Sequence, residues 1–263
     1  MTQASKDGDE ASPRVADATT REHDADLDLA SIDKVSEALR KLRAYCRLEV
    51  EGLDKIPDGP VILAANHTGW SGLDYANLFI TVYDGTGRIP RVAVHPSYFH
   101  VQWMRELGER LGFFEVSVQT STRILDEKGI VTFFPEAEAG NFKPFWKRYQ
   151  LQTFKPGFAR VALATEAPIV PVVIVGGEDA NPTLGRLKLQ HDALGEVPIP
   201  LPLGILPLPV KWRIAFLDPI DPGTYLSEES PDKDHAETMA RDLRALMQRE
   251  LDVQLEKRGH AFL

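Results

Sequence analysis

Two kinds of segment alternate along the chain, and the spacing of their apolar residues tells them apart. Short continuous apolar runs, typical of buried strands, occupy residues 48–53, 60–65, 88–94, 130–134, 168–175 and 211–217. Apolar residues at three- and four-residue steps, typical of amphipathic helices, occupy residues 29–48, 74–82, 102–111, 119–128, 155–166 and 233–257. This alternation predicts a single α/β domain with a mostly parallel central sheet flanked by helices. In the helix at 102–111, we expect the apolar side chains to face inward: Trp103, Met104, Leu107 and Leu111.

The first 27 residues differ in composition from the rest of the chain. They are rich in Asp, Glu, Ala, Thr and Ser and contain few large apolar side chains. Such a segment cannot bury enough surface to offset the entropy lost on ordering. We therefore predict a disordered acidic tail over residues 1–27 and a folded domain over residues 28–263.

Charge and cysteine content narrow the class of protein. The net charge is -9, but residues 1–35 hold nine acids and four bases, so the body is only mildly acidic and nucleic acid is not an expected partner. Cys46 is the only cysteine, which excludes an intramolecular disulfide and a cysteine-based metal site. No window holds the roughly 18 to 20 apolar residues of a spanning helix, and the acidic start does not resemble a signal peptide. We expect a cytoplasmic protein that, if its substrate is a lipid, visits the inner membrane surface peripherally.

Catalytic chemistry is expected first where the strand at 60–65 ends. The stretch 64–74, AANHTGWSGLD, places His67 at a small, glycine-containing turn before a helix. An imidazole can take a proton from a hydroxyl, and the carboxylate of Asp74 can fix its tautomer and stabilise the imidazolium. The alternative is a capping or packing histidine beside an ordinary surface aspartate. His95 and His100 lack this context and are interpreted as structural or pocket-lining residues.

A second candidate lies where the strand at 130–134 ends, in the stretch FPEAEAG. Because the carboxyl ends of parallel strands meet at one edge of a sheet, Glu136 is expected near His67. The double-glycine stretch at 176–179, GGED, superficially resembles a phosphate loop or a metal site, but it lacks the required spacing and is interpreted as a plain turn.

Residues 141–160 contain five basic residues, no acid and many aromatics. Cations interleaved with aromatic rings suit a phosphate-bearing ligand or a lipid headgroup interface. The candidates for substrate contact are Lys143, Arg148 and Lys155. The alternative is a loop with ordinary core aromatics.

Residues 197–210, VPIPLPLGILPLPV, are nearly all proline or aliphatic. Five prolines preclude a helix or a central strand. Such a segment must bury itself over a groove or present an apolar patch. We interpret it as a segment that dips into a bilayer or covers an acyl tunnel; the alternative is a linker.

Three motifs resemble those of the glycerolipid acyltransferases, the lysophosphatidic acid acyltransferase-like proteins. They are Asn66-His67 with Asp74, the run Phe134-Pro135-Glu136, and the strand 167–172, APIVPV; the resemblance covers roughly residues 48–225. The chain departs from the family pattern in three ways: His-x6-Asp replaces His-x4-Asp, Ala137 replaces a glycine, and EVSV at 115–118 replaces the arginine of the second motif. The missing arginine is reminiscent of the mono- and diacylglycerol acyltransferase-like branch.

The resemblance implies an O-acyltransferase that moves a fatty acyl group from acyl-CoA or acyl-carrier protein to a glycerolipid or lysophospholipid hydroxyl. It implies His67 as general base, Asp74 as its partner and Glu136 as a residue that positions the acceptor, with Gly69 or neighbouring amides at the oxyanion. No cofactor or metal is expected beyond the thioester co-substrate. A non-catalytic lipid-binding protein of the same fold and an acyl-thioester hydrolase are the competing hypotheses.

Overall fold

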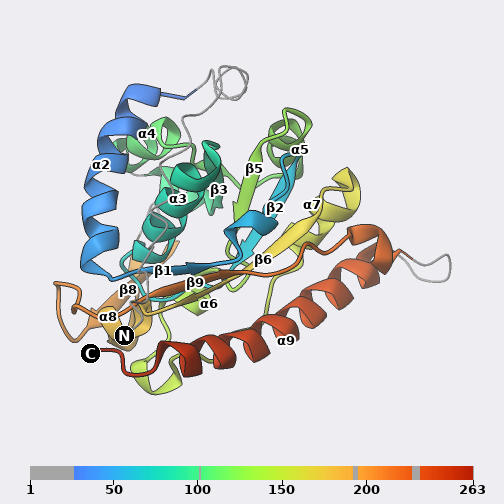
Figure 1. Ribbon diagram of the computed structural model, residues 1–263. Helices are drawn as coiled ribbons and strands as arrows, with labels where there is room; N and C mark the ends of the chain where they lie inside the picture. The colour runs from blue at the N-terminus through green and yellow to red at the C-terminus, as the bar shows by residue number, and fades with distance from the viewer. Residues whose placement is uncertain (1–26, 101, 192–194, 227–231, 263) are drawn as a thin grey trace, which may run out of the picture.

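The computed structural model describes residues 27–100, 102–191, 195–226 and 232–262 (Figure 1). Within these residues, seven strands form one sheet in the order β1-β9-β6-β2-β5-β3-β4. Their bounds are β1 (Glu49–Glu51), β2 (Val61–Ala65), β3 (Pro90–Val94), β4 (Phe114–Glu115), β5 (Ile130–Phe133), β6 (Ile169–Val175) and β9 (Arg213–Phe216). The predicted α/β sheet flanked by helices is confirmed.

Strands β6, β2, β5, β3 and β4 run parallel to one another, whereas β9 pairs antiparallel with β6 and carries β1 parallel to itself. The carboxyl ends of the three central strands β6, β2 and β5 therefore lie at one edge. In register, Ala64 pairs with Phe133 of β5, and Ala65 pairs with Val172 of β6. Segments that leave β2, β5 and β6 are thus brought side by side.

Helices cover both faces of the sheet, with α9 along one face and α2 and α3 on the other (Figure 1). The longer helices are α2 (Leu29–Tyr45), α3 (Leu73–Thr86), α4 (Gln102–Arg110), α5 (Val118–Asp126), α7 (Gly157–Thr165) and α9 (Asp232–Arg258). Shorter turns of helix are η1 (Leu53–Lys55), η2 (Pro96–His100), α6 (Glu138–Asn141), η3 (Phe145–Lys147), α8 (Gly177–Ala180) and η4 (Pro222–Tyr225). None of the described helices combines the length and the apolar character needed to cross a bilayer.

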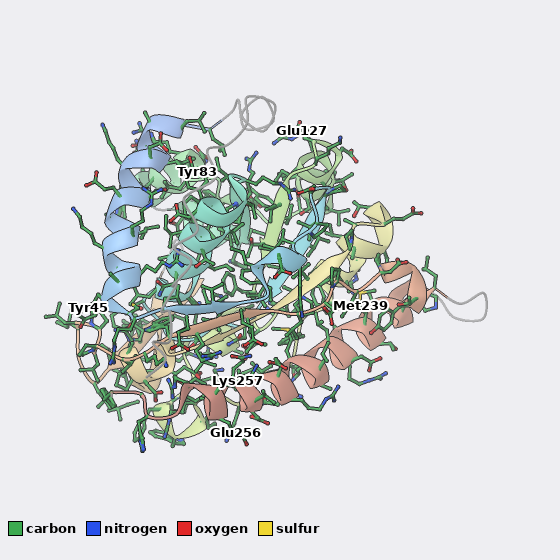
Figure 2. The ribbon with its side chains drawn as sticks, in the orientation of Figure 1. Tyr45, Tyr83, Glu127, Met239, Glu256 and Lys257 are labelled. Carbon is green, nitrogen blue, oxygen red and sulfur yellow. The ribbon has the colours of Figure 1, made fainter. Side chains whose placement is uncertain are left out.

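Alternate residues of β2 pack into opposite halves of the core, which explains its unbroken apolar sequence. Ile62 and Ala64 join the cluster formed with α5, α7 and α9. Leu63 and Ala65 join the cluster formed with α3 and the end of α2. Figure 2 shows the side chains of α9, among them Met239, which is buried in the first cluster.

One prediction of local structure is wrong. In α4, Trp103 and Leu107 are exposed, at 66% and 43%, because this helix lies outside the two main core clusters. The apolar segment at 197–210 forms neither a helix nor a central strand, as its prolines predict: its first part belongs to β8 (Gly195–Pro202), which pairs antiparallel with β7 (Thr183–His191) in a separate two-stranded ribbon. Proline is tolerated there because the ribbon has a free edge. The predicted tail lies outside the described residues, apart from Leu27, which is buried against α2 and α3.

Candidate active site

His67 and Asp74 meet at the carboxyl end of β2. Nδ1 of His67 lies 2.8 Å from Oδ2 of Asp74. The Asp74 side chain is fully buried, whereas that of His67 is 17% exposed. Asp74 also accepts hydrogen bonds from the backbone N–H of Thr68 at 3.0 Å and of Tyr75 at 2.8 Å. The carboxylate is therefore fixed, and Nε2 is the ring nitrogen left to face a substrate.

The loop between His67 and Asp74 accommodates its two extra residues with glycines in left-handed conformations. Gly69 has φ +102°, and Gly72, which caps the start of α3, has φ +73°. Only glycine adopts such angles at little cost. A Cβ on Gly69 would also lie 2.9 Å from the carbonyl oxygen of Gly177. Gly69, predicted to contact substrate, thus has a packing role against the segment after β6.

Two motif residues to which the sequence assigned no role hold this loop in place. The ring of Phe134, just beyond β5, stacks on the His67 ring with 4.1 Å between centroids and 11° between planes. Asn66 exchanges two hydrogen bonds with the backbone of Ile174 in β6, at 3.0 and 2.7 Å. The stack restricts the imidazole, and Asn66 continues the pairing of β2 with β6.

Glu136 lies close to His67, as predicted. A Cβ built on Gly140 of α6 would lie 2.8 Å from Cβ of His67 and 2.7 Å from Cβ of Glu136, so both residues press against this glycine. Oε2 of Glu136 accepts a hydrogen bond from the backbone N–H of Gln152 at 2.6 Å. Among the described residues, no donor reaches its buried Oε1.

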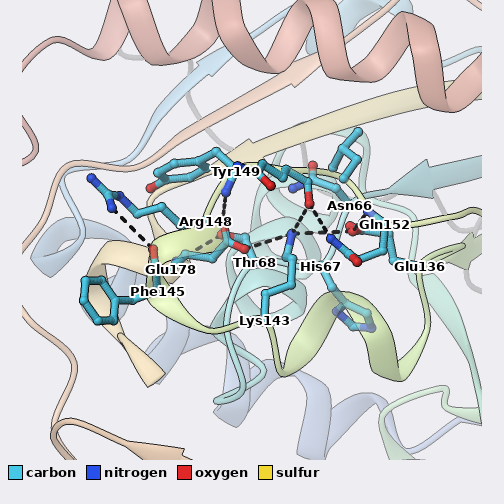
Figure 3. A network of polar contacts seen from close by, with 12 residues as sticks. Asn66, His67, Thr68, Glu136, Lys143, Phe145, Arg148, Tyr149, Gln152 and Glu178 are labelled. Atoms are coloured by element: carbon cyan, nitrogen blue, oxygen red, sulfur yellow. Dashed lines mark hydrogen bonds and ion pairs between the residues drawn. The ribbon is translucent and has the colours of Figure 1, made fainter. Parts of the chain in front are cut away.

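Lys143 lies between two buried carboxylates (Figure 3). Its Nζ is 3.4 Å from Oε2 of Glu136 and 2.9 Å from Oε1 of Glu178, and its side chain is only 3% exposed. Glu178 also accepts the backbone N–H of Tyr149 at 2.6 Å. The prediction of a plain turn at 176–179 is therefore wrong, because Glu178 turns inward to this ion pair. Its signal in the sequence was a carboxylate directly after the buried strand β6.

Burial and ion pairing act in opposite directions on this cluster. Burial acts to lower the pKa of Lys143, but the charges of Glu178 and Glu136 outweigh it, so the pKa lies above its ordinary value. Burial raises the pKa of Glu178, and Lys143 opposes only part of that rise. Glu178 is therefore protonated at a higher pH than an exposed glutamate.

The other two predicted basic contacts lie outside this pair. Arg148 is half-exposed, with its Nε 3.3 Å from Oδ1 of Asp179. Lys155 is exposed, and its backbone N–H donates to the carbonyl of Pro135 at 2.8 Å. A direct contact of Lys143, Arg148 or Lys155 with substrate stays a prediction.

Ala137 occupies a conformation that suits glycine. Its φ is +48° and its ψ is -143° at the start of α6. Non-glycine residues in such sparsely populated regions cost about 1–3 kcal/mol. The alanine that replaces the family's glycine is thus a point of backbone strain next to Glu136.

Within the described residues, no three His, Cys, Asp or Glu side chains gather so that they could hold a metal ion. The chemistry that the site offers is proton transfer at His67, oriented by Asp74, beside the buried polar cluster of Glu136, Lys143 and Glu178.

Comparison with protein families agrees with this arrangement. Residues 47–175 match the family model described as Acyltransferase. This range contains His67, Asp74 and Glu136, and it includes the strands β1 to β6 in full. The predicted family is therefore confirmed for residues 47–175. The leaning toward the mono- and diacylglycerol branch stays a prediction.

Similar sequences occur in mycobacteria. Uncharacterised proteins of Mycobacterium tuberculosis and Mycobacterium bovis are 34% identical over 202 residues, and one of Mycobacterium leprae is 33% identical. These alignments cover 72% of this chain and 55–56% of the relatives. The chain therefore spans little more than half the length of these relatives.

A solved structure shares the fold. The 1-acyl-sn-glycerophosphate (LPA) acyltransferase PlsC from Thermotoga maritima superimposes with a TM-score of 0.51 at 19% identity. The match covers 81% of this chain and 78% of that one. It supports the architecture of a mostly parallel sheet with flanking helices.

Replacing Lys143 by methionine should destabilise the protein strongly. The variant leaves Glu136 and Glu178 buried without their cation, and breaking a buried ion pair in this way costs about 3–5 kcal/mol. Urea denaturation at neutral pH measures the loss. The double variant K143M/E178Q should recover part of it; a loss below about 1 kcal/mol in K143M would contradict the assigned ion pair.

The loss of stability in K143M should depend on pH. Without Lys143, the folded-state pKa of Glu178 rises further above its unfolded value, because Lys143 lowers it. A raised pKa means that protonation favours folding at acid pH and that this contribution is lost as pH rises through the folded-state pKa. The stability gap between wild type and K143M should therefore narrow when urea denaturation is repeated at about pH 5.

Replacing Ala137 by glycine should stabilise the protein by about 1 kcal/mol. The gain is the relief of about 1–3 kcal/mol of strain, less about 0.5–1 kcal/mol for the greater freedom of glycine in the unfolded chain. The matched control is A139G, an exposed position in α6 that should lose about 0.5–1 kcal/mol. Equal urea midpoints for A137G and A139G would refute the strain.

Proposed function

We propose that the chain is an O-acyltransferase that moves a fatty acyl group from acyl-CoA or acyl-carrier protein to the hydroxyl of a glycerolipid or lysophospholipid. The observation that carries this proposal is the 2.8 Å contact between His67 and a fully buried Asp74, inside the residues that match the acyltransferase family. A histidine so oriented presents its second nitrogen as a base.

The proposed reaction needs no protein nucleophile. Nε2 of His67 takes the proton of the acceptor hydroxyl while that oxygen attacks the thioester carbonyl. Asp74 stabilises the imidazolium that forms. When the tetrahedral intermediate collapses, the carbon–sulfur bond breaks and the thiolate leaves with the proton returned by His67. Gly69 or a neighbouring backbone amide of the same turn is assigned to the oxyanion.

Glu136 is assigned to the acceptor. Its Oε1 is buried without a donor among the described residues, so a hydroxyl of the acceptor can supply one. Lys143 then acts through Glu136 by holding its other oxygen. Arg148 and Lys155, which are more exposed, are assigned to an acidic group of the acceptor or of the thioester donor.

The substrate sets the location that we propose. A glycerolipid acceptor resides in a bilayer, so the enzyme works peripherally on the inner face of the cytoplasmic membrane. No cofactor is assigned besides the acyl-CoA or acyl-carrier-protein co-substrate.

Replacing His67 by alanine should lower turnover by about 10²- to 10⁴-fold, the usual effect of removing a general base. The measurement is release of the free thiol from long-chain acyl-CoA and acyl-carrier protein across a panel of glycerolipid acceptors. H100A is the matched control, since His100 is exposed and lies outside this site. Thiol release that is independent of an acceptor would identify a hydrolase; lipid binding without release would identify a non-catalytic protein.

Replacing Gly140 by alanine should also lower turnover, by roughly tenfold to a hundredfold. The added methyl must displace His67 or Glu136, and a misplacement of about 1 Å can cost that much. G157A is the matched control, because a Cβ at Gly157 meets no atom within 4 Å. If G140A turned over as fast as G157A, His67 would not be positioned through this contact.

A further inference from the structure

Among the described residues, the aliphatic side chains with the highest exposed fractions lie at the end of the β7–β8 ribbon. Ile205 and Leu206 are 83% and 81% exposed in the loop that follows β8. We call residues 203–208 the apolar tip. Leu187 of β7 and Ile199 of β8, which are cross-strand partners, continue the exposed apolar surface along the ribbon. Water solvates none of these side chains favourably, so a covering partner is expected.

We propose, resting on the acyltransferase function above, that the apolar tip and the β7–β8 ribbon dock the protein onto an anionic phospholipid bilayer, with Ile205 and Leu206 inserted among the acyl chains. Insertion removes their aliphatic surface from water. Four features of the described residues select a bilayer as the partner.

The first feature is the way in which the two ends of the tip are fixed to the body of the protein. The N–H of Leu203 donates to the Pro182 carbonyl at 2.9 Å, and that of Leu208 donates to the Ala180 carbonyl at 2.8 Å. Pro207 has no N–H to satisfy. Between these ends, the N–H groups of Gly204, Ile205 and Leu206 donate to no backbone acceptor among the described residues. Because hydrocarbon offers such groups no partner, the backbone of the tip stays among the headgroups, and only the Ile205 and Leu206 side chains reach the acyl chains.

Side chains at and just beyond the end of α2 also hold this segment. The hydroxyl of Tyr45, labelled in Figure 2, donates to the Pro207 carbonyl at 2.7 Å. The guanidinium of Arg47 donates to the Pro209 carbonyl at 2.8 Å. Both side chains remain exposed, with a polar end beside an apolar tip. Tyrosine and arginine in this arrangement are typical of the boundary between headgroups and acyl chains.

The second feature is the outer edge of β8. Its residues Pro198, Pro200 and Pro202 pair opposite β7 in a register that places every second residue alike. Because proline cannot donate to β7, the backbone nitrogens at these positions point away from the ribbon. With proline at three of its positions, this edge offers few N–H donors to another strand. At the β8 edge, this disfavours a second copy of the chain that adds its own strand.

The third feature is charge. The protein carries a net charge of -9, yet residues 141–160 contain no acid and, besides the buried Lys143, four exposed bases: Lys147, Arg148, Lys155 and Arg160. In this stretch, η3 packs against β7 and exposes Trp146 and Lys147. An exposed tryptophan and an exposed lysine beside aliphatic side chains match an anionic lipid surface.

The fourth feature is a series of contacts that connects the tip and the ribbon to the candidate active site. Ser71, in the loop between His67 and Asp74, donates to Oδ1 of Asn181 at 2.7 Å. Asn181 is followed by Pro182, which binds the tip at Leu203. An ion pair between Arg186 of β7 and Glu138 joins the ribbon to α6 beside His67. A bilayer under the tip would therefore lie next to the site that takes its lipids.

The test is co-sedimentation of the purified full chain with vesicles of phosphatidylcholine and phosphatidylglycerol. The variant I205S/L206S should bind at least roughly tenfold more weakly than wild type, because two aliphatic side chains no longer enter the acyl region. The matched control is L226S/V253S, which removes two exposed aliphatic side chains elsewhere. Equal binding of both variants, or no binding of wild type, would overturn the docking surface. So would a wild-type dimer that I205S/L206S converts to monomers.

Turnover separates this proposal from the one on which it rests. Each variant is assayed on an acceptor carried in vesicles and on a short-chain acceptor dissolved as monomers. If both proposals hold, the ratio of vesicle to monomer turnover falls in I205S/L206S and is unchanged in L226S/V253S. If wild type binds vesicles through the tip but turns over no acceptor, the acyltransferase proposal fails while the docking surface stands.

Discussion

A single buried ammonium ties together the two segments that flank the candidate base. His67 follows β2, and β2 lies between β5 and β6 in the sheet. Glu136 follows β5 and Glu178 follows β6, so Lys143 reaches carboxylates on both sides of the histidine. Charges buried this deeply are costly unless each finds its partner. Lys143 consequently fixes the distance between the segments that follow β5 and β6. The geometry around His67 depends on this distance.

This constraint separates two kinds of polar group at the site. Asp74 has all of its partners within its own loop and helix, so the His67 pair is fixed locally. Glu136 and Glu178 share one cation, and Oε1 of Glu136 has no hydrogen-bond donor among the described residues. Unsatisfied buried acceptors are rare in stable cores and are more readily explained at sites that receive a ligand. The local pair suits proton transfer, whereas the shared cluster suits recognition of a hydroxyl.

The sequence was informative where chemistry follows a strand end directly. His67, Asp74 and Glu136 could be placed together because parallel strands bring their carboxyl ends to one edge. The ion pair of Lys143 and Glu178 could not be predicted from the sequence. Their contact depends on the path of the loop that carries Lys143, and no spacing of apolar residues reports that path. The exposure of Trp103 was missed for a related reason: the helical pattern gives an apolar face but does not say what covers it. The sequence did not predict the β7–β8 ribbon. Its prolines exclude a central strand, but they still permit an edge strand.

The spacing of His67 and Asp74 is longer than in the family pattern, and the structure gives the physical reason why the pair still meets. Their separation is set by two fixed points, the end of β2 and the first turn of α3, and the connecting loop only has to span them. Gly69 and Gly72 take up the extra residues in left-handed conformations that other residues adopt at a cost. Ala137 also has a positive φ, but as an alanine it adopts this conformation at a cost in free energy. A motif of this kind is therefore better defined by the positions of its two anchors than by the number of residues between them.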